Sequence, residues 1–118
     1  MSVDPEDEQL LRRAYEAFNA RDIEAAIALM HPDVDWPNAM EGTRLRGHAA
    51  VRDYWARQFE TITSQVMPQD FTTTADGRIA VDVHQMVHDT GGNLLTDATV
   101  RHVYAIADGL VTRMDIGP

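Results

Sequence analysis

The sequence predicts an α+β fold in which three N-terminal helices pack on a curved antiparallel sheet. Three observations lead to this prediction. Apolar residues recur at three- and four-residue steps as far as Glu60, and beyond Thr61 they alternate with a period of two. Two connections in the second half contain Asp-Gly, a dipeptide that tolerates the positive φ angles of tight hairpins. Helices confined to one half of a chain and strands to the other are typical of α+β proteins.

A pair of helices is expected first. Asp4 is placed to cap a helix over residues 5–19, and the proline and acidic residues after it suit the first turn. Asp22 is placed to cap a second helix over residues 23–30, and Pro32 prevents its continuation.

A short β-like segment separates this pair from a third helix. Val34 and Trp36 lie on one face of the segment and Asp35 lies on the other, until Pro37 ends it. A polar loop follows, and then a helix is expected over residues 47–60. The apolar side of that helix consists of Val51, Tyr54, Trp55 and Phe59.

Four strands are expected over residues 63–74, 78–89, 95–106 and 110–116. Pro68 predicts a bulge or an edge in the first of them. In the second strand, burial favours the side that carries Val81 as the inner face, which places His84 and His88 on the outer face. The alternative is a register reversed by a bulge, which would make Asp82 and His102 cross-strand neighbours.

Composition restricts the classes of function. The chain has 118 residues, ten arginines and no lysine, nineteen acidic residues, no cysteine and a formal net charge of −9. The length and the 44% hydrophobic content suit one domain over residues 1–118. The negative charge argues against nucleic acid and anionic membranes as partners. Since no apolar run approaches a signal peptide or a membrane span, we expect a soluble cytoplasmic protein.

Four local strings stand in a recognisable order. They are YEAFNARD at 15–22, DVDW at 33–36, GHAAVRDYW at 47–55 and HVYAIADGLV at 102–111. With the order of helices and strands, they resemble the cone-shaped, cystatin-like fold of the nuclear transport factor 2-like superfamily and its SnoaL-like family in particular. That superfamily includes ketosteroid isomerases and polyketide cyclases. The resemblance therefore implies a pocket inside a cone without fixing a reaction.

The resemblance to ketosteroid isomerase implies candidate catalytic positions. Tyr15 matches the tyrosine that donates a hydrogen bond to the enolate oxygen, and His102 stands where that enzyme has a protonated carboxylic acid. A neutral imidazole N–H is able to donate the same hydrogen bond. Trp36 stands where the base would be, before Pro37, and an indole cannot abstract a proton. Asp35 would need a bulge to turn it inward.

His102 is the strongest single candidate for chemistry, as an acid/base or as an oxyanion donor, because it shares an apolar face with Tyr104. In a SnoaL-type cyclase, Asp115 or Asp35 would be its carboxylate partner. The alternative is a structural histidine hydrogen-bonded to Tyr15 or to a backbone carbonyl. The predicted catalytic residues are His102, Tyr15 and Asp35.

Aromatic residues and a thioether are the predicted lining of the pocket. These residues are Phe18, Trp36, Trp55, Tyr104 and Met114. Such walls suit a flat, uncharged, apolar ligand, although ordinary core packing is the alternative for each residue. No metal is expected, because His84 and His88 would lie about 13 Å apart along a strand. No phosphate-binding loop or nucleotide fingerprint is present, so no cofactor is expected.

The sequence therefore predicts a SnoaL-like protein with an apolar pocket. Its chemistry would be proton transfer, of the isomerase, cyclase or dehydratase type, on a small cyclic or polyketide-like carbonyl compound. The alternative is a non-catalytic homodimer that binds a small apolar molecule. Because three short helices cannot cover both faces of such a sheet, we expect a dimer through the outer face.

Overall fold

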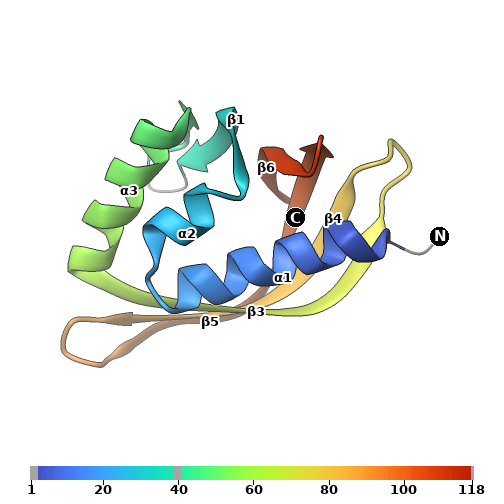
Figure 1. The fold of residues 1–118 in the computed structure, drawn as a ribbon. Coiled ribbons are helices and arrows are strands. Elements are labelled where there is room, and N and C mark those ends of the chain that lie inside the picture. Colours follow the sequence, from blue (N-terminus) through green and yellow to red (C-terminus); the bar gives the residue numbers. More distant parts are fainter. Residues whose placement is uncertain (1–2, 39–40, 118) are drawn as a thin grey trace.

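The computed structural model describes residues 3–38 and 41–117, and in these residues three helices lie on one face of a curved six-stranded sheet (Figure 1). The helices are α1 (Pro5–Asn19), α2 (Ile23–Ile27) and α3 (His48–Thr61). The strands are β1 (Met30–Asn38), β2 (Thr43–Arg46), β3 (Ile62–Thr73), β4 (Ile79–Asp89), β5 (Leu94–Ala107) and β6 (Leu110–Gly117). The predicted α+β class is confirmed.

The sheet has the order β2-β1-β6-β5-β4-β3. Neighbouring strands run antiparallel, except that β1 and β6 run parallel. We call the face that carries the helices the inner face and the opposite face the outer face. In Figure 1, α1 crosses the inner face while β3, β4 and β5 curve beneath it. No helix in the described part of the chain is long and apolar enough to cross a membrane.

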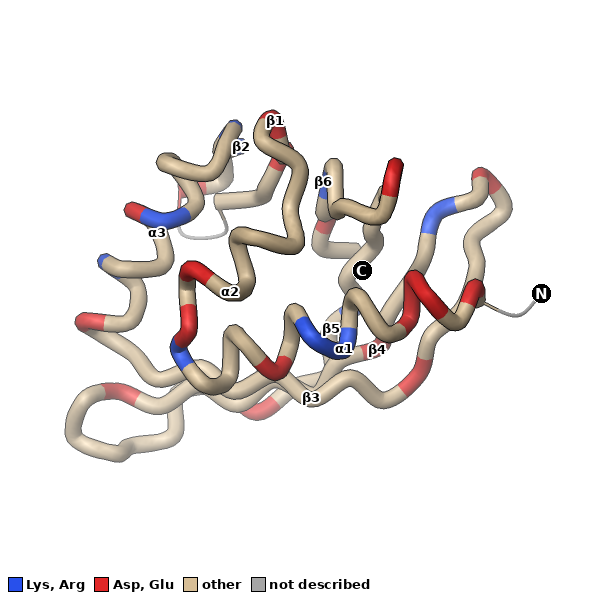
Figure 2. The backbone as a smooth tube through the Cα atoms, in the orientation of Figure 1, with Lys and Arg blue, Asp and Glu red and all other residues tan. Residues whose placement is uncertain are grey.

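The starts of the first two helices follow the sequence prediction. The carboxylate of Asp4 accepts a hydrogen bond from the backbone N–H of Glu6 at 2.8 Å, and acidic positions mark the first turn of α1 (Figure 2). The carboxylate of Asp22 likewise caps α2 by accepting from the N–H of Ala25 at 3.1 Å. Both aspartates satisfy amide groups that a helix start leaves without partners.

The segment between α2 and α3 departs from the prediction in two places. Helix α2 ends at Ile27 instead of residue 30, because Met30 already pairs with Val111 as the first residue of β1. Residues 43–46, expected within a polar loop, form strand β2 in a hairpin with β1. This edge strand has too few apolar residues to be recognised from sequence, since Leu45 is the one apolar residue among its four.

The four C-terminal strands agree with the prediction to within one residue at each end. The register shift between Pro68 and Asp70 is the bulge that the proline predicted. Asp108 and Gly109 have φ angles of 54° and 76° and join Ala107 to Leu110, its partner in the ladder. Two successive positive φ angles are those of a type I′ turn, so this Asp-Gly pair forms the expected tight hairpin.

The register of β4 against β5 decides which side chains face the helices. Val81 lies opposite His102 and is fully buried, as predicted for the inner face. Asp82 lies opposite Arg101, and the two side chains form an ion pair at 3.1 Å. The alternative register, with Asp82 and His102 as neighbours, is therefore wrong. Alternation without a bulge in this part of β4 keeps the acid on the outer face.

Candidate functional site

A cavity of about 120 Å³ lies between α1, α3 and the inner face of the sheet. Its apolar and aromatic lining is Ala14, Tyr15, Phe18, Met30, Trp36, Pro37, Tyr54, Trp55, Val66, Tyr104, Met114 and Ile116. The other lining residues are Gln58, Ser64, Gln85 and His102. Among the described residues that line it, none carries a carboxylate or a guanidinium group. The volume approaches that of cavities of about 150 Å³ that hold benzene in other proteins.

The aromatic wall is built from edge contacts that leave this space open. The ring centroids of Trp36 and Trp55 lie 5.5 Å apart at 89°, and those of Phe18 and Trp55 lie 5.4 Å apart at 71°. Edge-to-face packing of this kind is favourable and fixes the orientation of each ring. Phe18, Trp36, Trp55, Tyr104 and Met114, the five residues singled out from sequence for a pocket, all line this one cavity.

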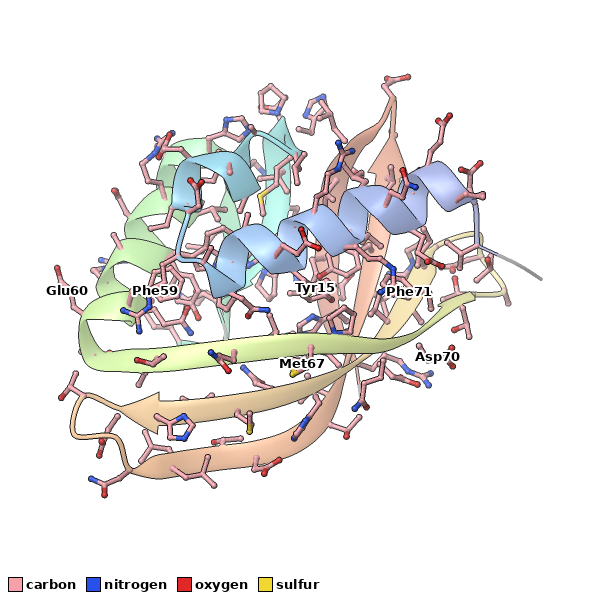
Figure 3. All side chains as sticks on the ribbon, turned by 60° about the horizontal axis from the view of Figure 1, so that its bottom comes forward. Tyr15, Phe59, Glu60, Met67, Asp70 and Phe71 are labelled. Carbon is pink, nitrogen blue, oxygen red and sulfur yellow. The ribbon has the colours of Figure 1, made fainter. Side chains whose placement is uncertain are left out.

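His102 belongs to a buried chain of hydrogen bonds with two tyrosines. The Tyr15 hydroxyl lies 2.9 Å from Nδ1 of His102, and the Tyr104 hydroxyl lies 2.7 Å from that of Tyr15. All three residues are at least 92% buried. Helix α1 supplies Tyr15, on the side that faces the sheet (Figure 3), and β5 supplies the other two from alternate positions of its inner face. The hydrogen bond between His102 and Tyr15, which the structural interpretation of His102 predicted, is present.

The buried hydroxyl of Tyr104 determines the direction of this chain. Among the described residues its partners are Tyr15, to which it donates, and Nδ1 of His102 at 3.5 Å. Tyr15 accepts from Tyr104 and so has its own proton to donate to Nδ1. An imidazole that accepts at Nδ1 carries its proton on Nε2 when it is neutral. The tyrosines thereby set His102 as the Nε2–H tautomer.

Nε2 is the ring nitrogen that remains for a ligand. No hydrogen bond in the described part of the chain uses it. Every fully buried side-chain nitrogen or oxygen among the described residues has a partner, so Nε2 is not fully buried. Since His102 lines the cavity, Nε2–H is a donor that a bound molecule is able to reach.

Burial keeps the whole chain of three groups uncharged. It lowers the pKa of His102 to about 4, because a charged imidazolium would lose its hydration. Burial also raises the pKa of Tyr15 and of Tyr104 well above the usual value of a phenol. A neutral imidazole with so low a pKa is a weak base at pH 7, whereas its N–H remains a good hydrogen-bond donor.

The candidate carboxylates lie elsewhere. Asp35 accepts from Arg44 at 2.8 Å and from Arg113 at 2.9 Å, and it does not line the cavity. Asp115 accepts from the same two arginines, and the hydrogen bond from Arg113 is the largest cause of its lowered pKa. Alternation along β1 and β6 places both acids on the side away from Trp36 and Met114. The structure thus brings Tyr15 and His102 together and does not bring Asp35 to them.

Three polar residues of the cavity, Gln58, Ser64 and Gln85, were missed by the sequence reasoning. Ser64 is 95% buried on β3, and the amide of Gln85 on β4 lies 3.4 Å from its hydroxyl. A signal for Gln85 was present, because position 85 continues the inward alternation of residues 79, 81 and 83. A polar residue in a row of inward apolar ones marks a candidate ligand contact.

Among the described residues, His84 and His88 on β4 do not belong to a cluster of side chains that could bind a metal ion. His84 pairs with Asp97 at 2.5 Å across the neighbouring strand. In the described ranges, no group of three or more His, Asp or Glu side chains is arranged to hold a metal ion.

Comparisons with known proteins agree with this architecture. TerC, co-crystallised with polyporic acid, is 27% identical, with 95% of this chain and 90% of that chain covered and a TM-score of 0.82. A nuclear transport factor 2-like protein of unknown function from Burkholderia pseudomallei K96243 is 26% identical, with 99% and 91% covered and a TM-score of 0.82. A proposed polyketide cyclase from Xanthomonas campestris pv. campestris is 25% identical, with 94% and 88% covered and a TM-score of 0.79.

No match was found among the curated proteins. The family described as the SnoaL-like domain matches residues 11–114, which include both helices and strands of the cavity wall. A match over this span, on a helix-covered curved sheet shared with the solved structures, shows that the chain belongs to the SnoaL-like family of the nuclear transport factor 2-like superfamily.

Proposed function

We propose that this protein binds a small, mainly apolar cyclic or polyketide-like carbonyl compound in the cavity. In this proposal, Nε2–H of His102 donates a hydrogen bond to the carbonyl oxygen. The observation that carries the proposal is the chain from Tyr104 through Tyr15 to Nδ1, which sets His102 as a neutral donor. The aromatic wall contributes apolar contact, and a lining without charged side chains favours an uncharged ligand.

The comparisons support a ligand of this class. TerC, at 27% identity, has been crystallised with the organic compound polyporic acid, and the Xanthomonas protein, at 25%, is proposed to be a polyketide cyclase. Both cover at least 94% of this chain.

Proton transfer on the bound carbonyl compound is a second candidate function. A hydrogen bond to oxygen strengthens as negative charge develops, so a donor at Nε2 stabilises an enolate more than the parent ketone. A neutral histidine performs this task in triosephosphate isomerase. The lowered pKa of His102 argues for this donor role over that of a base. The base would be a water molecule or a group of the substrate, since no carboxylate is among the described lining residues.

The test of binding uses two ring compounds that differ at one oxygen. We expect 1-tetralone to bind more tightly than tetralin, the hydrocarbon without the carbonyl group, by about 2- to 10-fold beyond any difference in their solubility. Tryptophan fluorescence reports binding directly, because Trp36 and Trp55 line the cavity. The variant His102→Phe keeps an aromatic ring and should remove the preference for the ketone.

The control is His88→Phe, the same change on the outer face of β4, which should keep the preference. Equal binding of ketone and hydrocarbon by the unmodified protein would refute the hydrogen bond. Deuterium exchange at the α-carbon of 1-tetralone in D₂O, measured by NMR, separates the two candidates. Acceleration that is lost in His102→Phe indicates catalysis, and binding without acceleration indicates a binding protein.

A further inference from the structure

Ser64 and Gln85 form a second polar pole in the same cavity. Both line it, as does His102. Val81 lies opposite His102 in the ladder, and Gln85 lies four residues further along β4. Four residues of an antiparallel strand span about 13 Å, so the two poles stand at opposite ends of the inner wall. The apolar lining residue Val66 lies opposite Gln85 in the register of β3 and β4.

This second pole has hydrogen-bonding capacity left for a ligand. The contact from the amide nitrogen of Gln85 to the hydroxyl of Ser64 is long, at 3.4 Å, and therefore weak. Among the described residues, no hydrogen bond uses the amide oxygen of Gln85. Because every fully buried side-chain oxygen in those residues has a partner, this oxygen is not fully buried. The Ser64 hydroxyl accepts from Gln85 and retains its proton for donation.

We propose that the cavity recognises a ligand at both ends: a flat molecule of two fused or linked rings, with a carbonyl oxygen at one end and a hydroxyl group at the other. The carbonyl group accepts from His102, as in the proposed function on which this inference rests. The hydroxyl group donates to the amide oxygen of Gln85, and Ser64 donates to the oxygen of that hydroxyl. Ile116 lines the cavity and is 46% exposed, so a two-ring compound is able to extend past it toward solvent.

A pair of tetralones tests this second pole independently of the first. 6-Hydroxy-1-tetralone carries the carbonyl and hydroxyl groups at opposite ends of two fused rings, and 1-tetralone lacks the hydroxyl group. We expect the hydroxy compound to bind the unmodified protein about 2- to 10-fold more tightly. Gln85→Leu should abolish this preference, and a circular dichroism spectrum and unfolding curve like those of the unmodified protein show that the variant is folded. Ser64→Ala should reduce the preference.

Gln65→Leu is the matched control, because Gln65 is the exposed neighbour of Ser64 and points to the outer face of β3. It should keep the full preference. A preference that survives both Gln85→Leu and Ser64→Ala overturns the second pole, as does its absence from the unmodified protein. If 1-tetralone still depends on His102 in that case, the proposed function stands alone. If neither tetralone binds the unmodified protein, both proposals are refuted together.

Discussion

At the scale of single residues, burial rather than a charged partner controls His102. The imidazole has a tyrosine hydroxyl at Nδ1 and is 92% buried, and its pKa falls to about 4. A carboxylate at Nδ1, as in a serine protease, would instead favour the imidazolium. Unlike the histidine of a serine protease, His102 is therefore suited to donate a hydrogen bond to oxygen and not to accept a proton.

The lowered pKa of His102 predicts a loss of stability in mild acid. Between pH 6.5 and about 4 the unfolded chain binds a proton at this residue and the native protein does not. The free energy of unfolding should therefore fall as the pH is lowered through this interval, by about 3 kcal/mol in total from His102. Urea unfolding at a series of pH values measures this loss.

The comparison is with His102→Gln, whose amide is able to accept from Tyr15 but does not titrate. The unmodified protein should lose more stability than this variant between pH 7 and 4, by the amount attributed to His102. Parallel curves for the two proteins would show that the histidine is not held neutral by the fold. Above pH 7 the two curves should run parallel, because His102 is then neutral in both the native and the unfolded chain.

The sequence identified Tyr15 and His102 as a pair because both lie in strings, at 15–22 and 102–111, that resemble the family. It did not identify the role of Tyr104 in setting the tautomer. Alternation shows that Tyr104 shares a face with His102, but not that its hydroxyl reaches Tyr15, which comes from a helix 89 positions earlier. Contacts between distant elements depend on how the helix sits on the sheet, and local spacing carries no information on that.

At the scale of elements, Arg44 connects its own strand β2 to β1 and β6 by hydrogen bonds. Its guanidinium donates to the side chain and backbone carbonyl of Asp35 on β1, and to Asp115 and the backbone carbonyl of Met114 on β6, at 2.8 to 3.2 Å. The ladder between β1 and β6 is irregular, with a register shift between Met30 and Asp35. Arg44 therefore supports the part of the sheet that carries Trp36 and Met114 into the cavity.

Arg44→Leu should lower the free energy of unfolding by about 1 to 2 kcal/mol, because charge-assisted hydrogen bonds to two strands are lost together. Amide hydrogen exchange in β1 and β6 should quicken more than in β3 and β4. Arg52→Leu is the control, since Arg52 makes a two-point ion pair with Glu24 between exposed ends of two helices. A smaller loss is expected there. Equal losses from the two substitutions would contradict the role assigned to Arg44.

The end of α2 and strand β2 could not be predicted from local sequence patterns. Asp-Gly turns and the alternation of valines predicted β4, β5 and β6 because the signal lies within each strand. Helix α2 ends early because the backbone N–H of Val111 donates to the carbonyl of Leu29, a contact that only the folded sheet supplies. Strand β2 exists because Leu45 lies opposite Trp36, and one apolar residue in four gives no readable period.

At the scale of the whole molecule, the three helices of residues 3–38 and 41–117 lie on the inner face, and no helix in these ranges covers the outer face of the sheet (Figure 1). Arg101 forms an ion pair with Asp82 on this face, and Nε2 of His84 lies within hydrogen-bond distance of the carboxylate of Asp97. The face also has an apolar component, because Met67 lies opposite His84 and is 53% exposed. An ion pair and an exposed apolar side chain on one uncovered face suit self-association of an acidic protein.

We therefore predict a homodimer through the outer face, with a sedimentation mass twice the 13.2 kDa of one chain at micromolar concentration. Met67→Glu should shift the equilibrium to the single chain, because an unpaired carboxylate would be buried between two subunits. Gln9→Glu adds the same charge on exposed α1 and should leave the dimer intact. A mass of one chain for the unmodified protein would refute the dimer. A dimer that survives Met67→Glu unchanged would place its interface elsewhere, since a face that buries an unpaired charge loses several kcal/mol.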